Sequence, residues 1–237
     1  MRTLTRRLKN RYLTGHHRRV RGRSDHPTRH AQLMLEEAAR RQPGGGLLCD
    51  VGAGADASVV AAAWPGRRLA LDLVLGPDLD VVADGHVLPL ADGSVAAALL
   101  MEVLEHVGDP LGLVRECARV LTPGGHLCVT APQYHITHNH PGDYFRYTRQ
   151  GLETLCSAAG LRVVAAWATG GPLLVVFHAI ELNLPPKSRV VFVALTYRLF
   201  DWLDGRLTRH GNRPGTSDAK GWALLAAKPA PAEAPRP

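Results

Sequence analysis

The pattern of apolar and polar positions predicts strands and helices in alternation along the chain. Short apolar runs predict strands at 46–51, 67–73, 79–84, 94–104, 124–132, 161–168 and 221–228. Helical spacing of apolar residues predicts helices at 29–41, 56–64, 109–121 and 148–160. Asp109 with Pro110 and Thr148 are suitable helix starts, and Gly160 is a suitable helix end. Such alternation indicates an α/β fold with a mostly parallel sheet and helices on both faces.

The segment before the last predicted strand does not follow this alternation. Residues 172–207 are rich in apolar side chains, and we expect two helices there. Three arrangements remain open for this apolar helical insertion: a lid over the domain, a pair of helices on a membrane surface, or ordinary core helices. We therefore divide the chain into a basic arm over 1–30, one main domain over 31–228 that includes the insertion, and a disordered tail over 229–237.

Composition supports one globular domain, since 46% of the 237 residues are apolar. No apolar run reaches the length of a membrane span, and the basic start lacks the apolar segment of a secretory signal. The four cysteines include no CxxC spacing, which favours reduced core thiols. We therefore expect a cytoplasmic protein, with peripheral membrane contact as an open possibility.

The net charge of +7 is concentrated at one end of the chain. Residues 1–30 carry ten Arg or Lys and one acid, whereas the remainder sums to −2. This arm is either a solvated terminus or a contact for a polyanionic surface. Because only Tyr12 accompanies the arm's basic residues, base stacking is poorly supported and nucleic acid is not an expected partner.

A glycine turn follows the first predicted strand. The stretch GAGADA at 52–57 comes between a strand and a helix, and Asp72 ends the next strand where it can hold a ribose diol. Nicotinamide cofactors and S-adenosylmethionine both contain such a ribose. Asp50, two residues before Gly52, would repel a pyrophosphate and attract the ammonium group of S-adenosylmethionine, which favours the second ligand.

Four motifs at consistent spacing resemble the class I S-adenosylmethionine-dependent methyltransferases, in particular methyltransferase type 11. They are DVGAGAD from Asp50, the acid Asp72, ADGHVLPLADGSV around Asp84, and MEVLEHV followed by RVLTPGG, and the resemblance covers about residues 45–168. It implies a Rossmann-like seven-stranded sheet whose last strand is antiparallel. Asp56 and Ala97 depart from the family pattern, which usually has a glycine and an acid at these positions.

The resemblance also assigns cofactor-binding roles. It implies a methionine pocket at the glycine turn, a ribose contact after the second strand, an adenine contact after the third and a methyl-side contact after the fourth. The residues in this order are Asp50, Gly52, Ala53 and Gly54; Asp72 and Leu73; Asp84, Gly85 and His86; and Glu102.

The loop after the fifth predicted strand, APQYHITHNHPGDYFRYT, concentrates reactive side chains. A histidine can remove a proton near neutral pH, so His138 and His140 are candidate bases, and Tyr144 and Arg146 are candidates for orienting the acceptor. Two other interpretations remain open: HxxHxH with Asp143 could bind a divalent metal, or the loop is only packed by its aromatic residues. We expect no resident metal, and we assign no catalytic role to His106.

These observations predict a methyltransferase that uses S-adenosylmethionine, with oxygen of a small-molecule, lipid-linked or glycan-linked acceptor as the expected target. Two alternatives are an NAD(P)-dependent oxidoreductase and an inactive Rossmann-like binding scaffold. The acceptor's identity and the oligomeric state do not follow from the sequence.

Overall fold

The computed structural model describes residues 27–54, 63–76, 78–138, 142–211 and 218–230, and side chains within these ranges except at 208–211. Several predictions concern residues outside these ranges. They are the arm up to residue 26, most of the predicted helix at 56–64, the candidate base His140, and the tail from residue 231.

The described strands form one sheet in the order β3-β2-β1-β4-β5-β7-β6. Strand β7 runs antiparallel to both of its neighbours, and the other adjacent pairs are parallel, as predicted. The bounds are β1 Leu47–Val51, β2 Arg67–Asp72, β3 Val81–Val82, β4 Val95–Met101, β5 Leu121–Pro132, β6 Arg162–Ala168 and β7 Gly221–Ala227.

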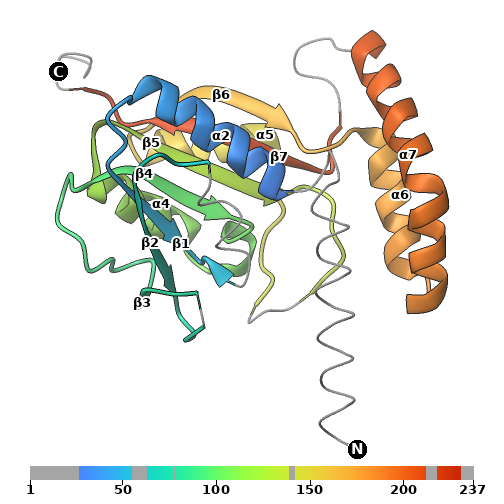
Figure 1. Ribbon diagram of the computed structural model, residues 1–237, viewed down its shortest axis with the longest axis horizontal. Helices are drawn as coiled ribbons and strands as arrows, with labels where there is room; N and C mark the ends of the chain where they lie inside the picture. The colour runs from blue at the N-terminus through green and yellow to red at the C-terminus, as the bar shows by residue number, and fades with distance from the viewer. Residues whose placement is uncertain (1–26, 55–62, 77, 139–141, 212–217, 231–237) are drawn as a thin grey trace, which may run out of the picture.

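Helices cover both faces of this sheet (Figure 1). Helix α2 (Pro27–Arg41) packs its apolar side on one face, where Met34 and Leu35 join Leu48 and Leu99 in a buried cluster. Helices α4 (Pro110–Val120) and α5 (Arg149–Ala158) cover the other face. Alternate residues of each strand therefore face opposite cores, as expected for strands buried on both sides.

Predicted caps begin and end these helices. Asp109 accepts a hydrogen bond from the Gly112 N–H at 2.9 Å, and the Thr148 hydroxyl accepts one from the Gly151 N–H at 3.1 Å. Gly160 ends the last turn after α5 with a φ of 77°. Side-chain oxygens at these positions satisfy N–H groups that have no partner within the helix.

Three strands differ from prediction by more than one residue at an end. The strand expected over 79–84 is shortened to β3. The strand expected over 94–104 ends at Met101, because Glu102 takes a φ of 55° and leaves the extended conformation. A short 3-10 helix, η2 (Leu104–His106), follows. Strand β5 begins at Leu121 rather than at residue 124, since Leu121 pairs with Val95 before a shift in register.

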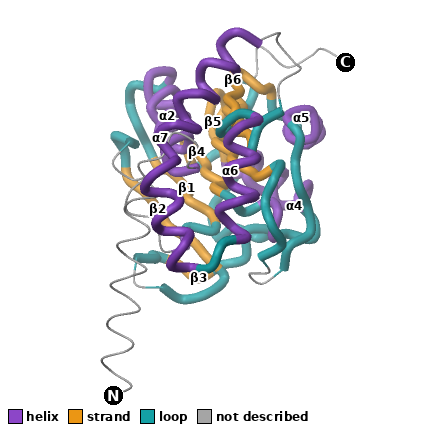
Figure 2. Tube along the Cα trace, turned by 90° about the vertical axis from the view of Figure 1, so that its right-hand side faces the viewer, coloured by secondary structure: helices purple, strands orange, loops and turns teal. Residues whose placement is uncertain are grey.

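The predicted insertion forms a helical hairpin of α6 (Pro172–Asn183) and α7 (Pro186–Gly211). Figures 1 and 2 show the two helices side by side at one end of the molecule, beyond the end of the sheet at which β6 finishes. Within the described part of the chain, no helix has the combination of length and apolar character needed to cross a bilayer.

Candidate active site

A pocket lies at the carboxyl ends of β1, β2 and β4. It has a volume of about 400 Å³, within the range of small-molecule sites. Ligands of open α/β sheets bind at this edge. The lining residues are Val51, Gly52, Asp72, Leu73, Ala83, Asp84, Gly85, His86, Glu102, Val103, His106, Val107, Gly108, Leu113 and Tyr144.

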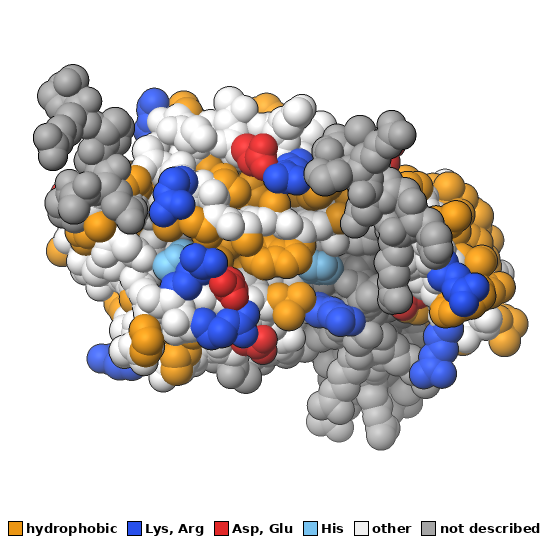
Figure 3. Space-filling model, turned by 90° about the horizontal axis from the view of Figure 1, so that it is seen from above, with side chains coloured by type: hydrophobic (Ala, Val, Ile, Leu, Met, Phe, Trp, Pro, Cys, Tyr) orange, Lys and Arg blue, Asp and Glu red, His pale blue; other side chains and the backbone are white. Residues whose placement is uncertain are grey.

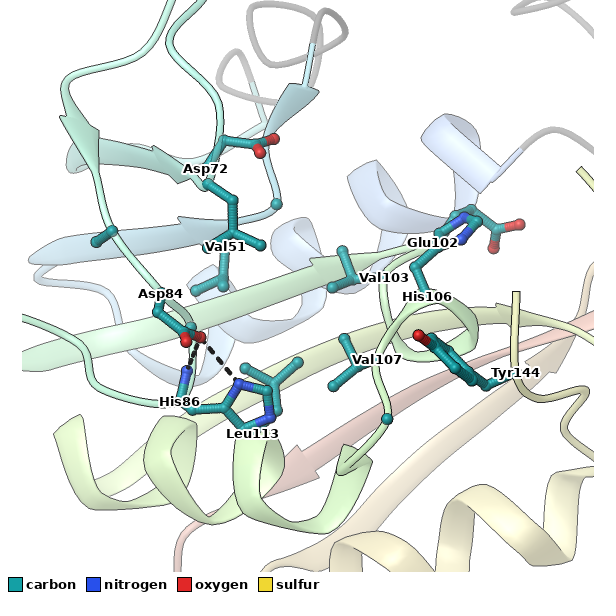
Figure 4. Close-up of a pocket in the computed structure, with 15 residues that line it drawn as sticks. Val51, Asp72, Asp84, His86, Glu102, Val103, His106, Val107, Leu113 and Tyr144 are labelled. Carbon is teal, nitrogen blue, oxygen red and sulfur yellow. Dashed lines mark hydrogen bonds and ion pairs between the residues drawn. The ribbon is translucent and has the colours of Figure 1, made fainter. Parts of the chain in front are cut away.

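The charged groups lie on two sides of the pocket. Asp72, Asp84 and His86 are on one side, and Glu102, His106 and Tyr144 are on the other (Figure 4). Among the fifteen described lining residues there is no Lys or Arg. The pocket therefore favours a cationic ligand and disfavours a diphosphate, because like charges repel strongly away from bulk water.

The glycine turn brings the backbone close to the pocket. Gly52 has a φ of 69°, and a Cβ added there would lie 2.6 Å from Cγ2 of Val103. A side chain at position 52 would thus be both strained and in collision. Gly85 has the same tight surroundings, since an added Cβ would lie 2.6 Å from Cδ1 of Leu113.

The Asp72 carboxylate is held at the end of β2. Its Oδ2 accepts the Gly54 N–H at 3.1 Å, and its Oδ1 accepts the Val74 N–H at 3.3 Å. These two bonds tie the glycine turn to the neighbouring strand end. A carboxylate fixed in this way has remaining lone pairs for the hydroxyls of a ribose.

Asp84 and His86 form a hydrogen-bonded pair. Oδ1 of Asp84 accepts a hydrogen bond from the backbone N–H of His86 at 2.9 Å and lies 2.9 Å from the ring Nδ1 of the same residue. The other ring nitrogen of His86, Nε2, lies 3.0 Å from the carbonyl oxygen of Asp109. Burial alone would lower the pKa of His86, but these acceptors outweigh burial and raise it. The hydrogen bond from the His86 backbone is the main reason that the pKa of Asp84 is lowered. The pair thus favours an ionised carboxylate with a protonated ring.

Glu102 is the single non-glycine residue with positive φ in the part of the chain that the structure describes. Its N–H donates to both the carbonyl and the hydroxyl oxygen of Thr130 on β5, each at 3.1 Å. Burial raises the pKa of the Glu102 carboxyl. Residues held in such a conformation are often part of a functional site.

The loop between β5 and α5 is anchored on η2. The Glu105 carbonyl accepts the Tyr144 N–H at 2.7 Å, and the Leu104 carbonyl accepts the buried Tyr147 hydroxyl at 3.1 Å. His106 adds a third link, since its Nδ1 lies 2.6 Å from the Gly142 carbonyl oxygen. A carbonyl only accepts, so Nδ1 carries the proton and Nε2 is the nitrogen that can receive one.

The structure places the predicted cofactor residues mostly at the pocket. Gly52, Asp72, Leu73, Asp84, Gly85, His86 and Glu102 line it. Ala53 is buried and Gly54 supports Asp72, without lining the pocket themselves.

Asp50 differs from the expected arrangement. Its side chain is 4% exposed, is not part of the pocket lining, and accepts a hydrogen bond from Nε of Arg68 at 2.9 Å. Burial raises the pKa of Asp50 to about 6, and the Arg68 charge counteracts this only partly. Asp50 is thus engaged by a protein cation. Of the acids that line the pocket, Asp84 is paired with His86 and burial raises the pKa of Glu102, so the preference for a cationic ligand rests mainly on Asp72.

The predicted catalytic residues are only partly brought together. Tyr144 lines the pocket. Arg146 instead donates hydrogen bonds to both carboxylate oxygens of Asp143, with its Nη2 lying 2.8 Å from Oδ2. Asp143 also accepts the His138 N–H at 2.9 Å. Arg146 and Asp143 therefore shape the loop, and the Arg146 hydrogen bonds hold the pKa of Asp143 well below its usual range.

Two residues to which the sequence assigned no role, Glu105 and His106, lie beside His138. Potential ligand atoms of these three residues lie within 4.8 Å of one another, so the group could hold a metal ion. This set differs from the HxxHxH spacing, of which the structure describes only His135 and His138. Burial raises the pKa of Glu105 to about 9, and the nearby Glu102 acts in the same direction. In the sequence, the only indication of this group was the adjacent pair of Glu105 and His106 in MEVLEHV.

Comparison with known proteins identifies the part of the chain that carries the pocket. Residues 43–129 match the family model described as "Methyltransferase domain". A ubiquinone biosynthesis O-methyltransferase of Xanthomonas oryzae pv. oryzae is 38% identical over 90 residues, which are 35% of this chain and 38% of that protein. The chain spans less than half the length of the curated relatives that it matches.

Solved structures share the fold over most of the chain. The 1,6-didemethyltoxoflavin-N1-methyltransferase of Burkholderia thailandensis, solved with S-adenosylhomocysteine, has a TM-score of 0.56 and 16% identity, covering 94% of this chain and 87% of that one. The [4+2]-cyclase SpnF has a TM-score of 0.52 and 20% identity, covering 84% and 82%. At such identities the likeness establishes the Rossmann-like fold.

Proposed function

We propose that the chain, whose residues 43–129 match the methyltransferase-domain model, is a class I S-adenosylmethionine-dependent methyltransferase, that its pocket binds S-adenosylmethionine, and that it transfers the methyl group to an acceptor oxygen. The observation that carries the proposal is the acidic pocket at the glycine turn, lined by Asp72, Asp84 and Glu102 without a described Lys or Arg.

The pocket residues fit this cofactor in shape and charge. Gly52 and Gly85 let the backbone pack closely against Val103 and Leu113 of the pocket lining, which a side chain at either position would prevent. Asp72 would hold the ribose hydroxyls, Asp84 with His86 would border the adenine, and Glu102 would face the methionyl end with its ammonium group. S-adenosylmethionine supplies an electrophilic methyl carbon on a positively charged sulfur.

The other side of the pocket supplies the groups for an acceptor. Methyl transfer to oxygen requires alignment and removal of one proton. His106 lines the pocket, and its Nε2 can accept that proton because Nδ1 is fixed by the Gly142 carbonyl. Tyr144, 62% exposed and on the same side, is suited to orient the acceptor. We therefore assign the base to His106 in preference to His138.

For the acceptor we propose a small-molecule or lipid-linked compound, and two observations support this class. The relative from Xanthomonas oryzae is named for O-methylation in ubiquinone biosynthesis. A small-molecule or lipid-linked acceptor with a hydroxyl group agrees with the apolar hairpin at the end of the molecule.

Calorimetric titration with S-adenosylhomocysteine, NADH and NADPH tests the cofactor assignment. We expect binding of the sulfur nucleoside and at least about tenfold weaker binding in Asp72→Asn, because one charged hydrogen-bond acceptor is lost. Saturable binding of NADH without binding of S-adenosylhomocysteine would instead identify an oxidoreductase.

Methyl transfer from labelled S-adenosylmethionine to a panel of phenols, quinols and lipid-linked alcohols tests the reaction. We expect His106→Asn to lower kcat about 100-fold or more while cofactor affinity stays within twofold, since general bases contribute this much. His138→Asn is the matched control. Equal loss in both variants would contradict the assignment of the base to His106.

A further inference from the structure

The hairpin of α6 and α7 has an aromatic seam on its inside. Phe177, fully buried, stacks on Phe192 with ring centroids 5.0 Å apart and contacts the rings of Tyr197 and Phe200 at 5.5 and 5.2 Å. The two helices therefore cohere through their own side chains.

The outside of the hairpin is also apolar, but it is exposed. In α7 the exposed positions recur at three- and four-residue spacing and so form one stripe along the helix. Leu195 is the most exposed, at 77%. The large apolar side chains that form this outer face are Val176, Ile180, Val191, Leu195, Leu199, Trp202, Leu203 and Leu207.

The exposed charged side chains of this outer face are basic. Lys187, Arg198 and Arg206 are exposed, and Arg206 lies over the Trp202 ring at 4.5 Å. The acids of the described hairpin are less exposed: Glu181 and Asp204 are 5% and 4% exposed, and Asp201 is half-buried. Figure 3 shows hydrophobic side chains with Lys and Arg among them at this end of the molecule.

We propose that the outer face of the α6–α7 hairpin docks on the surface of an anionic lipid bilayer. An apolar stripe bordered by Lys and Arg is the chemistry that binds such a surface, with the apolar residues in the acyl boundary and the cations at the headgroups. A second copy of this chain is a poorer occupant, because a two-fold interface would bring Arg198 and Arg206 of both copies together without exposed acids to pair with them.

Aromatic contacts connect the hairpin to the pocket. The ring of His178 on α6 lies 5.1 Å from that of His135, which lies 4.6 Å from His138, which lies 4.8 Å from the pocket residue His106. The hairpin that would dock therefore packs beside the acceptor side of the pocket.

Vesicle co-sedimentation of the full chain tests the docking. The vesicles contain phosphatidylcholine alone or an equimolar mixture with phosphatidylserine. We expect stronger binding to the mixture, at least about tenfold weaker binding in Leu195→Asp, and about fivefold weaker binding in Arg198→Ala. Leu75→Asp is the matched control, because Leu75 is 80% exposed and lies between β2 and β3, away from the hairpin, and it should bind within twofold of wild type.

Four results would overturn the proposal. The first two are no binding of wild type to either vesicle and equal binding to both. The third is vesicle binding that is unchanged in Leu195→Asp, which would place the contact elsewhere, such as on the basic arm. The fourth is a wild-type dimer in sedimentation velocity that Leu195→Asp dissociates. Titration of each variant with S-adenosylhomocysteine reports whether the cofactor pocket is intact, so failure of docking is distinguishable from failure of the proposed function. If Leu195→Asp does not fold, the salt-dependent effect of Arg198→Ala decides.

Discussion

The buried carboxylate of Asp204 on α7 accepts the backbone N–H of Gly171 at 2.7 Å, directly before the first turn of α6. It also accepts the N–H groups of Leu173 and Leu174 at 2.9 and 3.3 Å. A helix start normally receives its cap from the preceding residue, but Gly171 has no side chain to offer. The second helix of the hairpin thus caps the first, and the two should order together.

Replacing Asp204 tests this coupling. We expect Asp204→Ala to lower the free energy of unfolding by about 2 kcal/mol, because a cap is lost and buried N–H groups remain unpaired. Hydrogen exchange of the amides of Gly171, Leu173 and Leu174 should accelerate. Asp204→Asn, which keeps an acceptor, should cost less, and equal exchange in Asp204→Ala and wild type would contradict the coupling.

The glycine turn gives a prediction for ligand binding. Gly52→Ala should weaken S-adenosylhomocysteine binding at least about tenfold and destabilise the fold by about 1–2 kcal/mol, because position 52 has positive φ and an added Cβ would collide with Val103. Calorimetric titration and urea denaturation measure the two effects. Gly44→Ala is the control, since no atom lies within 4 Å of a Cβ added there, and a similar loss in both variants would argue against the steric reason.

The ion pair between Asp50 and Arg68 gives a prediction for stability. Arg68→Leu should destabilise the protein by about 3 kcal/mol at neutral pH, because it leaves a buried carboxylate unpaired. Adding Asp50→Asn should restore part of the loss. The loss of stability in Arg68→Leu should shrink at low pH, because the raised pKa of Asp50 means that protonation favours the folded state. Urea denaturation at several pH values measures this loss. A loss that is the same at every pH would contradict the prediction.

Glu105 gives a prediction for pH dependence. The pKa of Glu105 in the folded protein, about 9, is higher than that of a glutamate in the unfolded chain, so the folded state keeps a proton that the unfolded state releases. The contribution of Glu105 to stability is therefore lost as pH rises. Each pH unit above about 4.5 costs up to about 1.4 kcal/mol from this group. Glu105→Gln, which does not titrate, should therefore gain stability relative to wild type between pH 5 and 8 in thermal unfolding. A constant difference over this range would show that Glu105 does not titrate as described.

Periodicity was sufficient to predict β1, β4, β5 and β7, which are buried on both faces, and α2, α4 and α5, each of which has one apolar side. The caps at Asp109 and Thr148 were predictable for the same local reason, as their partners lie three residues away. The end of β4 was not, because the positive φ of Glu102 depends on its hydrogen bonds to Thr130, a residue of the neighbouring strand.

The candidate site likewise has a part that the sequence predicts and a part that it does not. Gly52, Asp72 and Asp84 follow strand ends, and strand ends of a parallel sheet meet at one edge, so their convergence could be predicted. The partner of Asp50 could not, because Arg68 reaches it from β2 in a register that spacing does not reveal. The role of His106 depends on Gly142, 36 positions away in a loop with no periodicity.

The position of β7 between β5 and β6 has a consequence for biosynthesis. Until residues 221–227 leave the ribosome, β5 and β6 each have an unpaired edge that can recruit another chain. Prematurely terminated products should therefore aggregate, and chaperone binding to nascent chains should persist until this last strand emerges.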